Sequence, residues 1–415
     1  MDTDKIASTH LGKKSFGSEV YNPSLLVAVP REENRKQYGI SEDRRAGGYE
    51  GRLFNDSNLS DIPQESQIDT DLTSYSPIAL SPQNNHTSIP PYLQPSDMLP
   101  HPNPLPQGEG ACKDSPSTDN SLPSCPPAFL PSGLPFEGFD IWHAYEFSCM
   151  TENGVPVTRL MKMKYQCDNE FLVESKSLKL YLNSFNMMKF GKNIEECLSI
   201  CKKMIEKDLS ELLKTTVEIN FLDNNSEQVK IFADFENIMN FVDENKLQIT
   251  EFKENPNILQ TEETKEVKEY RLKFDSLRSN CRVTHQPDFG DVFIYYKSKK
   301  HIKEDSLVKY LTSFRFEYHF HEECCEMIFK RLSDILNEKD ELMVCALYTR
   351  RGGIDICPIR WKLEGWRAES GKLKVESGKL SNFQLSTFNF QPYDIQNSIN
   401  CLLNLKTLAR NGIKQ

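Results

Sequence analysis

Two stretches of the chain show the same order of hydrophobic and polar positions. SLKLYLNSF at 177–185 and SLVKYLTSF at 306–314 share six residues at the same offsets. Glu-Glu-Cys follows each copy, at 195–197 and 322–324, and opens a run with an apolar residue every three or four positions. This spacing is typical of an amphipathic helix, so the pattern predicts a helix after each copy.

Segments of alternating polarity flank these helical runs and predict strands. Around the first copy they lie at 159–167 and 215–222, and around the second at 270–277, 291–297 and 341–349. The repeated unit is strand–strand–helix–helix–strand–strand. It predicts a duplicated α+β protein made of tandem modules with antiparallel sheets and helix pairs. Chance similarity of two amphipathic helices is the alternative, and it explains the shared Glu-Glu-Cys and the matching strands less well.

A long stretch before the first copy follows neither period. Sixteen of the 23 prolines fall between Pro63 and Pro135. Apolar residues there are too sparse to offset the conformational entropy that folding removes. We therefore predict a disordered insert at 46–131.

A second irregular stretch lies near the end of the chain. ESGKL occurs at 369–373 and again at 376–380, and neither copy has an apolar face. This repeat predicts a low-complexity insert. The expected organisation is an N-terminal segment 1–45, an insert 46–131, an N-terminal module 132–262, a C-terminal module 263–360, an insert 361–401 and a C-terminal end 402–415.

Composition and charge narrow the possible functions. The 415 residues include 50 Lys and Arg against 60 Asp and Glu, a net charge of −10, so binding driven by phosphate counterion release is not expected and nucleic acid is not a direct partner. No apolar run approaches the roughly 20 residues of a membrane span, and the start lacks the apolar core of a signal peptide. We expect a cytoplasmic protein with no membrane partner, whose twelve cysteines are reduced. Cys197 and Cys201 share one helix face without a nearby histidine, and we interpret them as semi-buried core residues rather than zinc ligands.

A candidate nucleophile stands in SNCRVTHQPDFGD, where Cys281, His285 and Asp288 fall within eight residues. A thiolate is a strong nucleophile, but an unperturbed thiol with a pKa of about 8.5 is only slightly ionised at neutral pH and needs activating neighbours. Asp288, in the turn after Cys281, could transfer protons to or from a reacting group. A buried cysteine beside a hydrogen-bonded aspartate is the alternative, and from these residues alone it is the better interpretation.

A second candidate is FRFEYHFHEECC. His319 and His321 could form a zinc pair, but a third ligand would have to come from elsewhere. Glu322, at a helix start, could accept N–H donors from a heterocyclic base, although acidic residues are favoured there in any case. We expect His319 to be an exposed polar residue.

Two further motifs carry cations near glycines or a helix start. Arg351 and Gly352 follow a predicted strand in YTRRGGIDI, and arginine with glycine suits phosphate binding, as does a plain turn. In VESKSLKLY, Lys176 and Lys179 oppose the dipole of a helix capped at Glu174, which indicates an anionic ligand unless both lysines are simply solvated. The predicted folded part has no glycine-rich Rossmann or P-loop motif, so any dinucleotide would be held differently.

Together these motifs resemble the 7-cyano-7-deazaguanine reductases, the nitrile reductases of queuosine biosynthesis. ESKSLKLY at 174–181 is similar to their E-(S/L)-K-S-x-K-x-aromatic motif. SNCRVTHQPDFG, FHEECCEMIF and YTRRGGIDI resemble their other signatures, in the order of the long, two-module subfamily. The resemblance covers about 1–45, 132–360 and a short end near 402–415. The two inserts depart from the family pattern.

The resemblance implies the tunnelling fold, a homodimer, no metal, and NADPH-dependent reduction of 7-cyano-7-deazaguanine to 7-aminomethyl-7-deazaguanine. Cys281 would form a covalent thioimide with the nitrile and Asp288 would donate a proton. The implied substrate-binding residues are Val173, Glu174, Ser175, His321 and Glu322. The implied NADPH-binding residues are Ser175, Lys176, Arg351 and Gly352.

Two alternatives to this resemblance stay open. One is a zinc-dependent, pterin-forming enzyme of the same fold, similar to GTP cyclohydrolase, which would need three clear metal ligands. The other is a non-catalytic, decayed paralogue, which the inserts suggest. The joint presence of Cys281, Asp288, His321 and Glu322 argues against decay.

Overall fold

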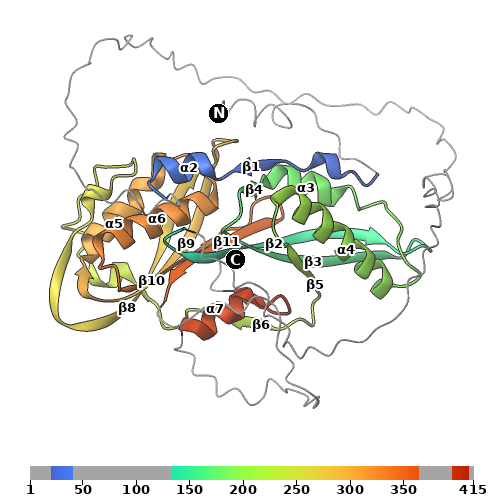
Figure 1. The fold of residues 1–415 in the computed structure, drawn as a ribbon. Coiled ribbons are helices and arrows are strands. Elements are labelled where there is room, and N and C mark those ends of the chain that lie inside the picture. Colours follow the sequence, from blue (N-terminus) through green and yellow to red (C-terminus); the bar gives the residue numbers. More distant parts are fainter. Residues whose placement is uncertain (1–19, 41–132, 364–394, 411–415) are drawn as a thin grey trace, which may run out of the picture. The chain divides into compact units, whose positions relative to one another are not determined.

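A computed structural model describes residues 20–40, 133–363 and 395–410. The predicted insert 46–131 and residues 364–394 of the second one lie outside the described residues. One eight-stranded sheet, in the order β5-β3-β2-β11-β10-β9-β8-β7, organises the described chain (Figure 1). Its strands are β2 (Glu137–Met150), β3 (Pro156–Gln166), β5 (Glu218–Leu222), β7 (Glu236–Asn237), β8 (Thr261–Asn280), β9 (Pro287–Ile302), β10 (Glu341–Tyr348) and β11 (Ile354–Lys362).

Neighbouring strands of the large sheet pair antiparallel, except for the short β7, which runs parallel to β8. The remaining strands of the described residues form two small sheets. β1 (Ala28–Pro30) pairs antiparallel with β4 (Phe171–Val173), and β6 (Gln228–Lys230) pairs parallel with β12 (Leu408–Arg410). The predicted mixture of helices with antiparallel strands is therefore confirmed, and the strands of both halves join in one large sheet rather than in separate sheets.

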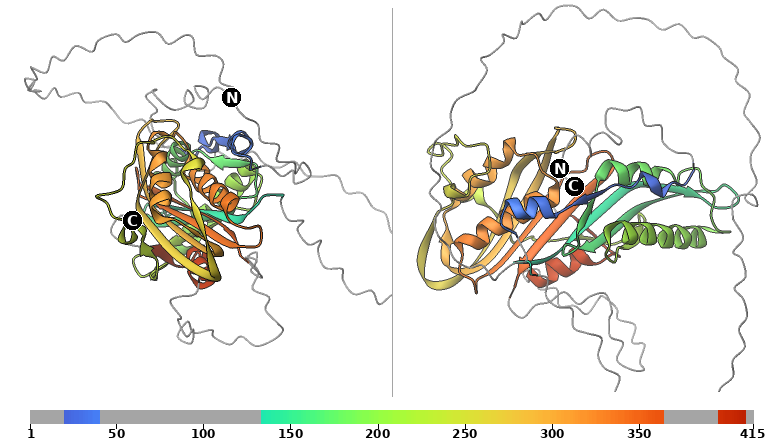
Figure 2. Two further views of the ribbon diagram at one scale, coloured as in Figure 1. Left: turned by 90° about the vertical axis from the view of Figure 1, so that its left-hand side faces the viewer. Right: turned by 45° about the horizontal axis from the view of Figure 1, so that its top comes forward.

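Helices cover both faces of the large sheet (Figures 1 and 2). The helices are α2 (Glu32–Gln37), α3 (Ser175–Asn183), α4 (Ile194–Leu213), α5 (Glu304–Thr312), α6 (His321–Ile335) and α7 (Ile395–Leu403). Apolar faces of α3 and α4 pack on β2, β3 and β5, and those of α5 and α6 pack on β8, β9 and β10. Helix α7 packs on the opposite face. No helix among the described residues is long and apolar enough to cross a membrane.

Strand β10 contributes side chains to the hydrophobic cores on both faces of the large sheet. Because successive side chains of a strand point to opposite faces, Val344 and Ala346 join the core under α5 and α6, whereas Met343 and Cys345 join the core under α7. Every residue of the strand after Glu341 is buried. A continuous apolar run is the expected pattern for a strand covered on both faces.

The two predicted halves share this single sheet through the pairing of β2 with β11, where Ile356 stands opposite Trp142. The C-terminal half follows the predicted order, with β8, β9, α5, α6, β10 and β11. The N-terminal half departs from it after β5, because β6 leaves the large sheet and pairs with β12. Strand β5 therefore forms one edge of the sheet.

The predicted boundaries of the second insert, 361–401, are wrong at both ends. Strand β11 continues to Lys362, and helix α7 begins at Ile395. The reason is an apolar face with helical spacing: Ile395, Ile399 and Leu402 are buried against the sheet. These residues were assigned to the insert because the repeated ESGKL precedes them.

Candidate active site

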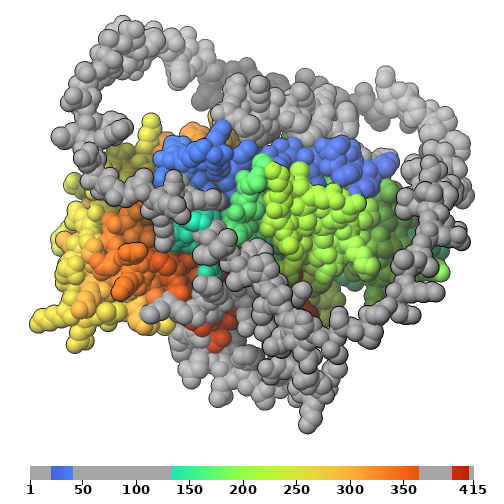
Figure 3. Space-filling model, in the orientation of Figure 1, coloured from blue at the N-terminus to red at the C-terminus, as the bar shows by residue number. Residues whose placement is uncertain are grey.

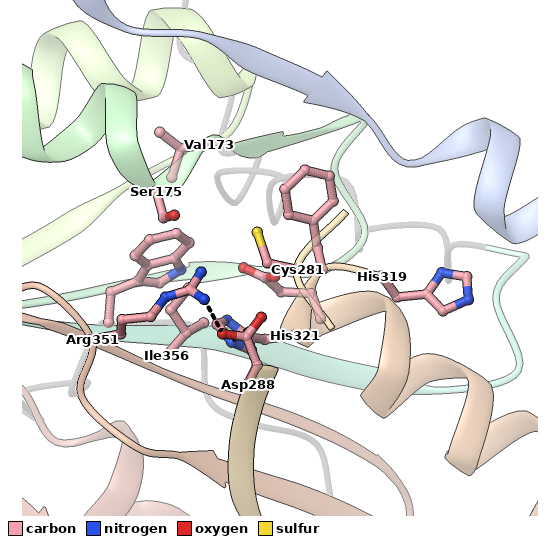
Figure 4. Close-up of a pocket in the computed structure, with 11 residues that line it drawn as sticks. Val173, Ser175, Cys281, Asp288, His319, His321, Arg351 and Ile356 are labelled. Carbon is pink, nitrogen blue, oxygen red and sulfur yellow. Dashed lines mark ion pairs between the residues drawn. The ribbon is translucent and has the colours of Figure 1, made fainter. Parts of the chain in front are cut away.

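A pocket lies where the starts of α3 and α6 meet the turns between β8 and β9 and between β10 and β11 (Figure 4). Its volume is about 280 Å³, including the space open to solvent. The lining residues are Trp142, Val173, Ser175, Cys281, Asp288, His319, Phe320, His321, Glu322, Arg351 and Ile356.

Cys281 follows the end of β8, and its sulfur points into the pocket (Figure 4). Backbone hydrogen bonds fix the chain on both sides of it. Asn280 N donates to Glu317 O at 2.8 Å, and Cys281 N donates to Gln286 O at 2.8 Å. The side chain is 7% exposed. A ligand in the pocket can therefore reach a thiol that bulk solvent hardly touches.

Asp288 lies beside this thiol, but in a strand rather than in the predicted turn. It is the second residue of β9, opposite Ser279 of β8, and the alternation of the strand buries Asp288 between exposed Pro287 and Phe289. The carboxylate is held by two groups. Arg351 Nη1 is 2.9 Å from one oxygen, and His321 Nε2 is 3.5 Å from the other.

His285, which the sequence places near Cys281 and Asp288, does not line the pocket. It occupies the turn between the two strands with a φ of +55°. Its backbone N–H donates to Cys281 O at 2.9 Å, and its ring stacks edge-on against Tyr318. His285 therefore shapes the turn that presents the thiol.

Glu322 brings an acidic side chain to the pocket from the first turn of α6. It is 2% exposed, and its Oε1 has no hydrogen-bond partner among the described residues. Burial, together with the charge of Asp140, raises the pKa of Glu322 to about 8. A buried, unpaired carboxyl oxygen facing a pocket is suited to a ligand that carries N–H donors.

His319 is buried, so the expectation of an exposed residue is wrong. Its Nε2 lies 3.1 Å from Glu317 Oε2 and 3.3 Å from the hydroxyl of Tyr38. Burial lowers the pKa of His319, but the hydrogen bonds to Glu317 and Glu323 outweigh burial and raise it overall. In Figure 4 the ring points away from Cys281 and Asp288. Of the predicted pair, only His321 lies beside Asp288.

The start of α3 forms another wall of the pocket. Val173 and Ser175, which the resemblance assigns to the substrate or the cofactor, line it. Glu174 uses both carboxylate oxygens to cap the helix: they accept from Lys176 N at 2.9 Å and from Ser177 N at 2.6 Å. Its carboxylate is thus held by the helix end, beside the pocket rather than in its lining.

A corner rich in cations adjoins the pocket at the turn between β10 and β11. Lys179 Nζ donates to Arg351 O at 2.8 Å. Burial and the nearby Arg351 lower the pKa of Lys179. Gly352 has a φ of +56°, and a Cβ at this position would stand 2.6 Å from Lys179 Nζ. Gly352 therefore leaves space for Lys179. Lys176, in contrast, does not line the pocket.

Three residues of the lining were missed by the sequence reasoning: Trp142 of β2, Phe320 before α6, and Ile356 of β11. They come from segments far apart in the chain and supply apolar surface. Hydrophobic periodicity does not distinguish a core position from a pocket wall.

A buried ion network lies one helical turn beyond Glu322 and was also missed. Glu326 accepts from Arg35 at 2.8 and 2.9 Å and from Arg360 at 2.9 Å, and Arg31 is 3.3 Å away. Asp140 balances Arg31 and Arg360. These arginines anchor the N-terminal segment, which lies across both halves of the described chain (Figure 3).

A zinc-dependent site requires at least three ligand atoms that can converge on one ion. Within the parts of the chain that the structure describes, two groups meet that condition: Cys149, Cys197 and Cys201, and His143, Asp355 and Cys357. None of these six residues lines the pocket. The donor set of the pocket thus gives no support to a pterin-forming zinc enzyme.

Comparison with known proteins gives a consistent result. A family described as "Nitrile reductase, 7-cyano-7-deazaguanine-reductase N-term" matches residues 129–221, and one described as "QueF-like protein" matches residues 287–364. Among curated proteins, relatives from Colwellia psychrerythraea, Rickettsia felis and Legionella pneumophila (strain Lens) are 37%, 38% and 40% identical over 235, 241 and 234 residues. These matches cover 55%, 58% and 55% of this chain and 79%, 84% and 77% of the relatives. Each relative is named NADPH-dependent 7-cyano-7-deazaguanine reductase.

Proposed function

We propose that this chain, which belongs to the 7-cyano-7-deazaguanine reductase family, uses NADPH to reduce the nitrile of 7-cyano-7-deazaguanine to a primary amine. The product would be 7-aminomethyl-7-deazaguanine, a step of queuosine biosynthesis. The observation that carries the proposal is the thiol of Cys281 pointing into a small pocket beside Asp288.

The first chemical step is addition of the Cys281 thiolate to the nitrile carbon. A carbon–sulfur bond forms, the carbon–nitrogen triple bond becomes a double bond, and Asp288 passes the proton that the thiol loses to the nitrile nitrogen. The resulting thioimide accepts a hydride far more readily than a nitrile does. When bound, NADPH would supply the hydride for each of two reductions. Between them the carbon–sulfur bond breaks, which gives an imine and returns the Cys281 thiol, and two protons are taken up overall.

Glu322 and His321 would bind the deazapurine. The unpaired Oε1 of Glu322 can accept the N–H groups of the heterocycle, and the burial of this carboxyl makes such hydrogen bonds strong. His321, 3.5 Å from Asp288, can pass a proton to it. Val173, Glu174 and Ser175 would complete the substrate site from the start of α3.

The cation corner fits the phosphates of NADPH. Lys179 and Arg351 bring two positive charges together, and Gly352 carries no Cβ that would obstruct a close approach. Ser175 and Lys176 at the start of α3 would add donors. On this proposal Arg351 has two tasks, since it also holds Asp288 at 2.9 Å.

The same proposal assigns the chain two tandem modules of the tunnelling fold and a homodimeric assembly. The order of elements in the C-terminal half and the single sheet shared by both halves support the assignment. Edges of large sheets tend to be covered by partners. A second copy would cover the edge formed by β5 and the opposite edge, where the two-residue strand β7 pairs with only a small part of β8.

The test is NADPH oxidation by the purified chain in the presence of 7-cyano-7-deazaguanine, with the amine product identified by mass spectrometry. Wild type should consume two NADPH for each amine formed. Cys281→Ala should abolish turnover, whereas Cys401→Ala, a half-buried thiol on α7, should retain it. Absence of nitrile-dependent NADPH oxidation by folded wild type would refute the proposal and favour a decayed paralogue.

A further inference from the structure

Three buried thiols converge in the N-terminal half, away from the pocket. Cys149 lies next to the end of β2, and Cys197 and Cys201 lie one turn apart at the start of α4 (Figure 1). All three are 0% exposed. Their sulfur atoms lie within 4.8 Å of one another, and the sulfurs of Cys149 and Cys197 are 3.3 Å apart.

Backbone hydrogen bonds hold this cluster in place. Met150 N donates to Met188 O at 2.9 Å, and Phe190 N donates to Met150 O at 2.9 Å. The sulfur of Cys197 approaches Met150 O at 3.3 Å. Two rigid elements, a strand end and the first turns of a long helix, therefore present the three sulfurs, so that no loop has to be ordered when a ligand binds.

The C-terminal half shows that packing here does not require three thiols. There Asn280 takes the place of Met150, because it makes the same pair of backbone hydrogen bonds, to Glu317 and from His319. The position before it, which corresponds to Cys149, is Ser279. By the Glu-Glu-Cys match, Cys324 corresponds to Cys197, and the residue four further on is Ile328 rather than cysteine. Three converging sulfurs are thus a feature of the N-terminal half.

We propose that Cys149, Cys197 and Cys201 form a binding site for a thiophilic monovalent cation, and that Cu(I) is the ion whose preferences this donor set meets. Soft thiolate ligands select Cu(I), Zn²⁺ and iron–sulfur clusters. Structural zinc takes four protein ligands. No fourth histidine, cysteine or carboxylate joins these three sulfurs among the described residues. Cu(I) accepts three thiolates in a plane, and an apolar, water-free surrounding stabilises this ion against oxidation.

Binding would exchange protons for the metal ion. Each thiol that ligates the cation as a thiolate releases its proton to the solvent, and neither the metal nor the sulfur changes its oxidation state. The bound ion would join the end of β2 to α4. The expected consequence is a higher stability of the N-terminal half, independent of the chemistry at Cys281.

The experiment measures copper bound to the purified full chain after anaerobic dialysis against Cu(I) supplied as its acetonitrile complex. Chain purified from copper-supplemented cells is measured in parallel. All samples carry Cys281→Ala so that the pocket thiol does not compete. We expect one Cu(I) per chain, sulfur-only coordination by X-ray absorption, and a raised unfolding temperature. The triple variant C149A/C197A/C201A should lose the bound copper and the temperature shift.

A matched control removes three other buried thiols, in the variant C167A/C325A/C345A, and should bind copper like the parent chain. Copper retained by the C149A/C197A/C201A variant, or no copper in either preparation of the parent, would overturn the proposal. So would a Cys149–Cys197 disulfide in the freshly purified chain, since it would show an oxidised pair in place of a metal site. The nitrile reductase assay on wild type is separate, so failure of one proposal leaves the other untouched.

Discussion

Replacing Glu326 with glutamine tests the buried network that supports the pocket. Glu326 is 2% exposed and is the shared anion of Arg31, Arg35 and Arg360. In the variant, Asp140 still pairs with Arg31 and Arg360, whereas Arg35 loses its carboxylate partner. Removing one partner of a buried ion pair costs about 3–5 kcal/mol, because the remaining charge stays desolvated. We expect the free energy of unfolding to fall by about that amount.

The assay is equilibrium unfolding in urea, followed by circular dichroism. The free energies of unfolding of wild type and variant are compared with one common value for their dependence on urea concentration. Asp334→Asn is the matched control on the same helix, since Asp334 pairs with Lys330 at the surface and should cost less than about 1 kcal/mol. A double variant, E326Q/R35M, removes one surplus cation together with the anion. Its loss should be smaller than the sum of the two single losses.

The pH dependence of stability provides a second readout. Burial would raise the pKa of Glu326, but the charges of Arg35 and Arg360 outweigh burial and hold it well below its ordinary value of 4.5. The stabilisation is therefore fully present above about pH 4.5 and is lost as the pH falls further. Wild type should show this acid-dependent loss, and E326Q should lack that component. A variant that unfolds like the Asp334→Asn control would refute the reasoning.

Three further predictions concern the pocket. Gly352→Ala should raise the KM for NADPH about tenfold in initial-rate assays. A φ of +56° is unfavourable for alanine, and the added Cβ would crowd Lys179. An unchanged KM would contradict the phosphate role. The wild-type kcat/KM for the nitrile should rise as the pH passes through about 8, where Glu322 becomes a carboxylate. Glu322→Gln should lower kcat/KM about 10- to 100-fold and remove this rise. A variant with the wild-type pH profile would exclude Glu322 as a substrate-binding residue. Asp288→Asn should form the thioimide more slowly and lower kcat by about 10²–10⁴-fold in steady-state assays. Wild-type turnover would exclude Asp288 as proton donor.

Local patterns in the sequence were enough for much of the fold. The alternation at 291–297 and 341–349 became β9 and β10, and the apolar spacing after each Glu-Glu-Cys became α4 and α6. Helix α7 was missed because it stands beside a low-complexity repeat. The pairing of β6 with β12 was missed because it joins segments far apart in the chain, and periodicity carries no information about partners.

The candidate site followed mainly from the family resemblance, since the residues alone favoured a structural role for Cys281. The structure brings Cys281, Asp288, His321 and Glu322 to one pocket. The burial of His319 could not be foreseen, because its partners come from the N-terminal segment and the neighbouring loop. The ion network around Glu326 joins residues about 290 positions apart in the chain, and no local motif marks a pair of that separation.

Intact-mass measurement can detect the proposed covalent bond between Cys281 and the nitrile carbon. The chain is mixed with 7-cyano-7-deazaguanine alone, without NADPH, and compared with Cys281→Ala and with wild type alkylated at its thiols. We expect the mass of wild type to increase by that of one ligand, which peptide mapping should locate at Cys281. Neither comparison sample should show this increase. The same increase on Cys281→Ala, or no increase on folded wild type, would contradict it.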